Sequence, residues 1–377
     1  MKRMRNLGQM LAIVLAGWAV GCSTKATTTA DASAATDTGA GDGGDTATVD
    51  SASDTGGGPR VLKWAQYAPT VDTASGQKLR SCAIIPGQPG QYAVVGDKAS
   101  AWQLSDTTLS DLSPKDNDLG DLQGVWVSPT GTWYVVGSGN SVAKREKNTW
   151  IVAGDVAPSP PVQFKGVAGS SDTDVWAVGS SRNVWHFDGT NWLASDLSAV
   201  TLPVGVSWTT DVGFNCVATR TPGDVYVGVA LSSGGAVLHG KNGAWSLQTV
   251  AVAPAQLWVA DTGQVYAVGG IDAPWVAIGD GSTWTAFDAA KLTGSQFGYN
   301  AVGGVSASMA WIGGTKGQLR VWDGKSWNVE DIKSPPGTSP ALKFAAAETL
   351  IGLGVHAADE RVVLTASTLY RWAKQPL

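Results

Sequence analysis

The sequence predicts an all-β protein, a seven-bladed β-propeller built from four-stranded antiparallel blades. A segment typified by Asp-Val-Trp-Ala-Val-Gly at 174–179 recurs in altered form along most of the chain. The copies are spaced by about 40–50 residues, which is the length of a propeller blade. Their apolar residues alternate with period two, are rich in Val, Trp and Tyr, and are interrupted by glycine, as expected of short strands.

Seven copies can be counted from the residue that closes each apolar run, which is glycine in most of them. These closing residues are Gly96, Gly137, Gly179, Val229, Gly269, Gly314 and, in the last and weakest copy, Ala366. Helical repeats of similar length would need apolar residues at i, i+3 and i+4, which these runs lack. A helical array is therefore excluded.

One unit shows how each blade is divided into strands. Residues 165–168 are expected to form the inner strand, 174–179 the second, 183–187 the third and 192–195 the outer one. The turn before the outer strand is Asp188-Gly189, and its counterparts are Asn242-Gly243, Asp280-Gly281 and Asp323-Gly324. Asp-Gly and Asn-Gly tolerate the positive φ angles of tight hairpins, so their fixed place indicates a mechanical requirement.

A tryptophan follows each of these turns at a nearly fixed offset. The residues are Trp150, Trp192, Trp245, Trp284 and Trp327. A large ring at one position in blade after blade is typical of a wedge between neighbouring sheets. The alternative, a ligand-stacking role, does not require recurrence in every blade.

These residues resemble known propeller families. The Asp-Gly-x-x-Trp turns are similar to degenerate Asp boxes of BNR-repeat propellers. The fuller unit resembles photosystem II assembly factors and related YVTN/BNR-like bacterial surface propellers, over residues 60–377. The copies have His186, Ile278 or Val321 where an Asp box has Ser or Thr. The resemblance therefore implies the propeller fold, and it does not extend to sialidase chemistry.

The two ends of the repeat region indicate how the ring closes. The last copy, 361–366 followed by 368–372, ends after its third strand, so the chain has no outer strand for this blade. The stretch 60–67 is an unassigned strand ahead of the first copy. We expect it to supply the missing fourth strand, which would remove two exposed sheet edges.

Residues 1–21 are predicted to be a lipoprotein signal peptide. Lys2, Arg3 and Arg5 precede an apolar run that is short for a membrane span, and the run ends in Gly21-Cys22. This ending resembles the bacterial lipobox, which implies lipidation of Cys22. A cleaved secretory signal is the alternative. Ser23 follows the cysteine, so the resemblance implies an outer-membrane lipoprotein, either periplasmic or exposed at the surface.

Residues 22–59 are predicted to be a disordered tether ahead of the propeller at 60–377. The segment consists mainly of Thr, Ala, Asp, Gly and Ser, and its length implies a mean span on the order of 35 Å. The chain has a net charge of −5, which falls to about −8 once the basic signal is removed. Nucleic acid is therefore an unsuitable partner, and contact with the membrane is expected through the lipid alone.

The residue types that catalyse reactions form no recognisable set. Cys82 and Cys216 start blades that lie almost opposite each other, too far apart for a disulfide. His186 and His239 share one position in successive copies, which favours a structural role, and His356 is expected in a solvated loop. An acidic cluster at Asp106, Asp111, Asp116 and Asp118 leaves open a calcium loop, with only a partial match to the required spacing.

We therefore expect a monomeric, non-catalytic scaffold without cofactor or metal that binds a protein or glycan partner at the cell envelope. The alternative is a carbohydrate-active enzyme, either glycosidase or lyase, or a lectin on the same propeller. Irregular insertions are the expected contact regions, because the repeat does not account for them. The candidate contacts are Trp208 in the insertion 196–213, and Lys333 and Lys343 in the insertion 333–343.

Overall fold

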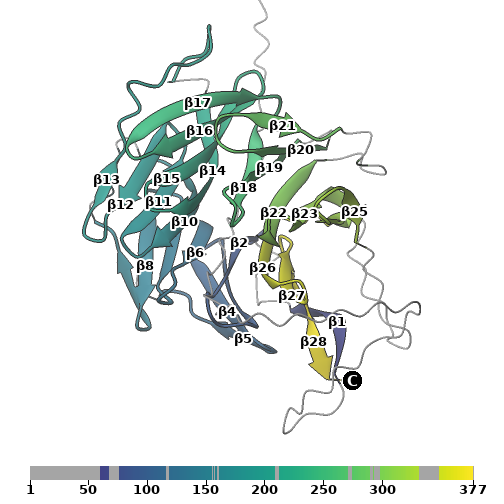
Figure 1. The fold of residues 1–377 in the computed structure, drawn as a ribbon. Coiled ribbons are helices and arrows are strands. Elements are labelled where there is room, and N and C mark those ends of the chain that lie inside the picture. Colours follow the sequence, from purple (N-terminus) through teal and green to yellow (C-terminus); the bar gives the residue numbers. More distant parts are fainter. Residues whose placement is uncertain are drawn as a thin grey trace, which may run out of the picture.

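The strands form seven four-stranded antiparallel sheets arranged as blades around a ring (Figure 1). The computed structural model describes residues 60–67, 76–115, 119–154, 156, 158, 161–208, 212–270, 274–288, 292, 298–330 and 348–376. Nearly all regular structure in these ranges is strand, with one short 3₁₀ helix, Thr315–Gly317. No helix in this part of the chain has the length and apolar character needed to cross a membrane. The predicted fold class is confirmed.

Six blades consist of four consecutive strands each. Blades 1 to 3 are β2–β5 (Leu79–Ile84, Gln91–Gly96, Ser100–Ser105, Thr108–Asp111), β6–β9 (Leu122–Val127, Trp133–Gly137, Val142–Glu146, Thr149–Val152) and β10–β13 (Phe164–Ser171, Asp174–Gly179, Asn183–Phe187, Trp192–Ala194). Blades 4 to 6 are β14–β17 (Val212–Thr221, Asp224–Leu231, Gly235–Lys241, Ala244–Val250), β18–β21 (Pro254–Val259, Val265–Gly269, Trp275–Gly279, Trp284–Ala286) and β22–β25 (Tyr299–Ser306, Met309–Gly314, Leu319–Trp322, Trp327–Val329).

Blade 7 combines the two ends of the propeller sequence, as predicted. Strands β26 (Gly352–Ala357), β27 (Glu360–Leu364) and β28 (Leu369–Pro376) are completed by β1 (Arg60–Tyr67), which pairs antiparallel with β28 from Arg60↔Pro376 to Tyr67↔Leu369. Figure 1 shows the purple β1 beside the yellow β28. One detail differs: β27 ends at Leu364, so Ala366 does not close its strand as the glycines do in other copies.

The recurring Asp-Gly turns form as expected. Asp323 Oδ1 accepts hydrogen bonds from the backbone N–H groups of Lys325 and Ser326, both at 2.8 Å, while Gly324 has φ +89°. Asp188 and Asp280 accept the same pair of bonds from the second and third residues after them. The carboxylate thus satisfies two N–H groups that the hairpin leaves without strand partners.

The tryptophan after each turn packs toward the preceding blade. Trp192 shares a buried cluster with Tyr134 of blade 2, and the Trp327 ring centroid lies 6.2 Å from that of Tyr266 in blade 5. Trp245 meets Trp176 of blade 3 edge-on at 5.7 Å. Trp192 and Trp327 are buried, whereas Trp150, Trp245 and Trp284 are only partly buried. The predicted tryptophan wedges between blades therefore exist, and they differ in how far they are buried.

Candidate functional site

Of the three residues predicted as partner contacts, the structure describes only Trp208. Trp208 is partly buried against the core of blade 4, edge-on to Phe214 at 6.2 Å, with the Arg182 guanidinium 4.9 Å from its ring centroid. Its role as a contact stays a prediction. Lys333, Lys343 and the lipidation residue Cys22 lie outside the described residues.

A polar pair recurs at the same two positions of four blades, at the start of the second strand and on the adjoining third strand. The pairs are Gln91–Gln103 at 2.7 Å, Asp174–His186 at 2.9 Å, Asp224–His239 at 2.7 Å and Glu360–Arg371 at 2.8 Å. The strand registers confirm the equivalence, because the second member always faces the residue two places after the first. Such recurrence is typical of a structural device of the repeat.

Two of these pairs are packed by aromatic rings. The His186 ring stacks on Trp176 with centroids 4.1 Å apart, and the His239 ring stacks on Tyr226 at 4.3 Å. Burial disfavours the charge on Asp174, but hydrogen bonds from His186, Ser170 and Trp176 outweigh it and lower the pKa of this carboxyl. Each of the two histidines is hydrogen-bonded to a carboxylate, in agreement with the structural role predicted for them.

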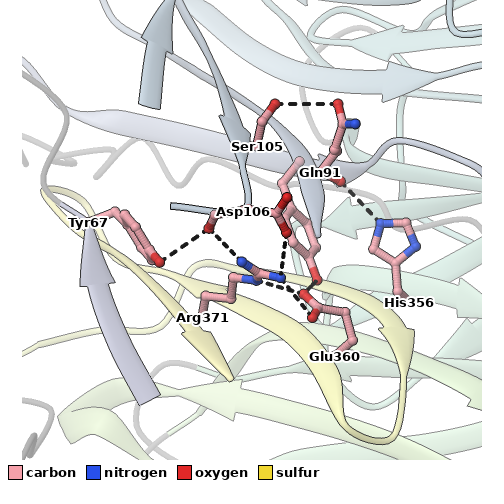
Figure 2. A network of polar contacts seen from close by, with 8 residues as sticks. Tyr67, Gln91, Ser105, Asp106, His356, Glu360 and Arg371 are labelled. Carbon is pink, nitrogen blue, oxygen red and sulfur yellow. Dashed lines mark hydrogen bonds and ion pairs between the residues drawn. The ribbon is translucent and has the colours of Figure 1, made fainter. Parts of the chain in front are cut away.

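The blade 7 pair belongs to a larger network that joins blades 7 and 1 (Figure 2). The Glu360 carboxylate accepts hydrogen bonds from Arg371 Nε and Nη2 and, at 2.6 Å, from the Tyr92 hydroxyl of β3. Arg371 Nη1 and the Tyr67 hydroxyl both donate to the Asp106 carbonyl in the β4–β5 turn. Burial and the Glu360 charge raise the pKa of Tyr92, so its hydroxyl stays a donor. The network therefore stabilises the contact between blades 7 and 1, where the ring closes.

One sequence prediction is corrected at this junction. His356 lies in strand β26 and not in a solvated loop: its ring packs edge-on to Tyr92, and its Nε2 lies 3.1 Å from the Gln91 carbonyl oxygen. Burial lowers the pKa of this histidine. Asp106 is the acceptor of Arg371, while Asp116 and Asp118 of the suggested calcium loop lie outside the described residues. Among the residues that the structure describes, no group of three His, Cys, Asp or Glu could hold a metal.

Polar side chains also occupy five of six equivalent positions on the innermost strands. The innermost strand of six blades has a β-bulge at one position, occupied by Arg80, Gln123, Lys165, Asn215, Ala255 and Asn300. Lys165 Nζ donates to Asn215 Oδ1 at 3.1 Å, and Arg80 forms a two-bond ion pair with Asp97. Burial lowers the pKa of Lys165. These bonds link neighbouring strands, as expected of groups that hold the ring together.

The two cysteines form no disulfide with each other and are poorly reactive. Cys82 and Cys216 are both free thiols that are buried at the start of their blades. Burial raises the pKa of both thiols to about 12. A thiolate is therefore scarce at neutral pH, and neither residue is suited to nucleophilic chemistry.

Two cavities among the described residues are grooves between adjacent blades. The groove between blades 2 and 3, called the 2/3 groove, has a volume of about 410 Å³. It is lined by Tyr134, Ala143, Lys144, Ile151, Val152, Ala153, Gly154, Phe187, Gly189, Thr190, Asn191 and Trp192. Ile151 and Val152 are 45% and 47% exposed, so the groove presents apolar side chains to solvent.

The 5/6 groove, between blades 5 and 6, has a volume of about 590 Å³. Its lining residues are Thr262, Gly263, Gln264, Ile278, Gly279, Asp280, Thr283, Thr285, Phe287 and Trp322. The two grooves occupy the same place in the repeat, because Lys144 pairs with Ile151 in blade 2 as Ile278 pairs with Thr285 in blade 5. Sequence reasoning missed both grooves, since each joins residues of two different copies.

The comparisons with known proteins agree on the fold. No protein-family model and no curated protein sequence matches this chain. The solved structure of YCF48 from Cyanidioschyzon merolae is 15% identical with a TM-score of 0.62, covering 82% of this chain and 99% of that one. A structure of YCF48 bound to a D1 peptide is 13% identical with a TM-score of 0.58, covering 83% and 97%.

Another similar structure is a catalytically inactive virginiamycin B lyase from Staphylococcus aureus with quinupristin. It is 10% identical with a TM-score of 0.62, covering 83% of this chain and 99% of the lyase. Similar propellers thus include both a peptide-binding protein and an enzyme. At these identities the likeness shows a shared β-propeller fold, in agreement with the resemblance to photosystem II assembly factors. Membership of the BNR family stays a prediction.

Proposed function

We propose that this chain is a non-catalytic β-propeller that binds a segment of another protein at the bacterial cell envelope. Its anchor would be a lipid on Cys22 in the outer membrane, with residues 22–59 as the tether. The observation that supports binding most directly is the 2/3 groove, whose exposed Ile151 and Val152 form an apolar surface that the fold itself leaves uncovered.

The chemistry of the 2/3 groove favours an extended, acidic and partly apolar segment. Strand β9 is the outermost strand of blade 2, so an added strand could pair with its outer edge. The adjoining hairpin contains Lys144, Arg145 and Lys147 with a single acid, Glu146, in a chain of net charge −5. Lys144 lies 5.9 Å from the Phe187 ring centroid at the floor of the groove. Positive charge beside an apolar groove is complementary to such a segment.

Binding is favoured over catalysis by the use that the fold makes of its charged groups. The acid–base pairs Asp174–His186, Asp224–His239 and Glu360–Arg371 recur at one repeat position, whereas catalytic groups need a single cleft. The likeness to a peptide-bound YCF48 structure adds support for a protein partner. The likeness to a lyase concerns the fold and supplies no catalytic constellation.

The test is a pull-down from envelope membranes with the full-length protein and two matched variants. Ile151→Asp places a charge in the 2/3 groove, and Thr285→Asp places one at the equivalent position of the 5/6 groove. We expect a protein partner that wild type and Thr285→Asp retain and that Ile151→Asp loses. Equal recovery with all three chains would place the partner elsewhere and would contradict the proposal.

A further inference from the structure

The 5/6 groove repeats the architecture of the 2/3 groove with different chemistry. At equivalent positions Lys144 is replaced by Ile278, Ile151 by Thr285, Ala153 by Phe287 and Phe187 by Trp322. The exchange removes the basic group and the exposed aliphatic side chain, and it adds a hydroxyl and an aromatic ring. An acidic, apolar peptide that fits the 2/3 groove therefore does not suit the 5/6 groove.

The aromatic side chains of the 5/6 groove pack edge-on against one another. Phe287 is only partly buried, and its ring meets Trp322 at 5.0 Å and Trp327 at 6.3 Å, both edge-on. Trp322 is fixed in turn by its indole N–H, which donates to the Ala307 carbonyl at 3.1 Å. The face of such a ring is electronegative and apolar, so it suits the C–H face of a sugar.

Polar side chains line the groove around these aromatic rings. Thr262, Gln264, Asp280, Thr283 and Thr285 line the groove together with Phe287 and Trp322. Within the described part of the chain, the Thr285 hydroxyl and the Gln264 side-chain nitrogen have no hydrogen-bond partner. They can therefore bond sugar hydroxyls, which both donate and accept.

The charge of the groove indicates which class of sugar it can bind. Among the described residues that line the groove, Asp280 is the only ionisable side chain, and its Oδ1 already accepts bonds from both Ser282 and Thr283. Hydrogen bonds from the Thr283 and Ser282 backbone lower the pKa of Asp280, so this carboxylate is charged at neutral pH. Anionic sugars would be repelled. We propose that the 5/6 groove is a binding site for one or two units of a neutral oligosaccharide, in a volume of about 590 Å³.

The experiment uses the full-length protein and four probes: cellotetraose, maltotetraose, chitotetraose and, as the anionic control, tetragalacturonate. Saturation-transfer NMR and calorimetry should show binding of at least one neutral tetrasaccharide and none of tetragalacturonate. Phe287→Ala and Thr285→Ile should each weaken that binding by about tenfold or more. Thr285→Ile copies the residue of the 2/3 groove and lies on the exposed outer strand, so it tests the site without disturbing the core.

The matched control is Ile151→Thr, which makes the opposite exchange of isoleucine and threonine, at the equivalent position of the 2/3 groove. It should leave oligosaccharide affinity unchanged. Failure of all three neutral probes to bind, or binding that survives both 5/6 groove variants, would overturn the proposal. The protein-partner proposal is measured separately through Ile151→Asp, so either can fail without the other.

Discussion

At the scale of single residues, the protein uses one carboxylate per hairpin to fix its turns. Asp323 is exposed, and hydrogen bonds from the backbone of Ser326 and Lys325 lower its pKa from 3.8 to about 2. Because the folded pKa lies below the unfolded one, the stability from this turn is present above about pH 4 and is lost as pH falls toward 2. Acid should therefore loosen these hairpins before it affects the apolar core.

The measurement is an NMR titration of the Asp carboxyl groups, combined with urea unfolding between pH 2 and 5. Asp323→Asn keeps an acceptor at the same place and removes the titrating group. We expect the variant to fold at neutral pH and to show a shallower loss of stability in acid. An identical pH profile for both chains would show that the carboxylate contributes nothing there.

The recurring tryptophans should differ in energetic weight according to their burial. Trp192→Ala and Trp327→Ala remove buried rings and should each cost about 3–5 kcal/mol of unfolding free energy. Trp284→Ala should cost less, since Trp284 is only partly buried. Trp208 has no counterpart in other blades, and we expect Trp208→Ala to keep the fold and weaken partner binding. Denaturant melts of the four variants decide this, and a Trp208→Ala melt as low as that of Trp192→Ala would assign Trp208 to the core.

At the scale of elements, the closing strand β1 brings a buried aromatic group to blade 7. Trp64 lies 5.5 Å from Trp372, and the Arg361 guanidinium lies 5.5 Å from the Trp64 ring and 4.9 Å from that of Trp311. Arg361 is buried and also pairs with Glu330, which follows blade 6. The strand therefore completes a blade and covers a buried cation at the junction with blade 6.

Deleting residues 60–67 should destabilise the whole ring, because blade 7 loses its outer strand and Arg361 loses its contact with Trp64. Trp64→Ala alone should cost about 3–5 kcal/mol. The control deletion removes residues 23–56 and should leave the melting temperature nearly unchanged. Thermal melts of both deletions test this, and equal shifts would show that β1 does not stabilise the closure.

The repeat itself explains how much of these elements could be predicted. Strand periodicity, the Asp-Gly turns and the unassigned strand at 60–67 all follow from local residue patterns, which the fold must satisfy in every blade. The grooves could not be predicted in the same way, because Ile151 and Phe187 come from different copies and their contact depends on blade packing. His356 was misjudged because its Gly- and Ala-rich surroundings resemble a loop.

At the scale of the whole molecule, we expect a propeller held at a membrane by its N-terminus. Cys22→Ala should leave the protein soluble or as an uncleaved precursor, because the proposed tether offers no other anchor. Detergent-phase partitioning and mass spectrometry of the mature N-terminus measure this. Mature Cys22→Ala protein recovered in the membrane fraction would reject the lipoprotein proposal.

The central claim, that the 2/3 groove holds a segment of another protein, is tested most directly by photo-cross-linking in intact cells. A photoreactive amino acid is placed at position 151 and, in a matched chain, at position 285. We expect a defined protein adduct from position 151, with its cross-linked peptide acidic and partly apolar, and no such adduct from position 285. Absence of a protein adduct at position 151, or the same adduct from both positions, would contradict it.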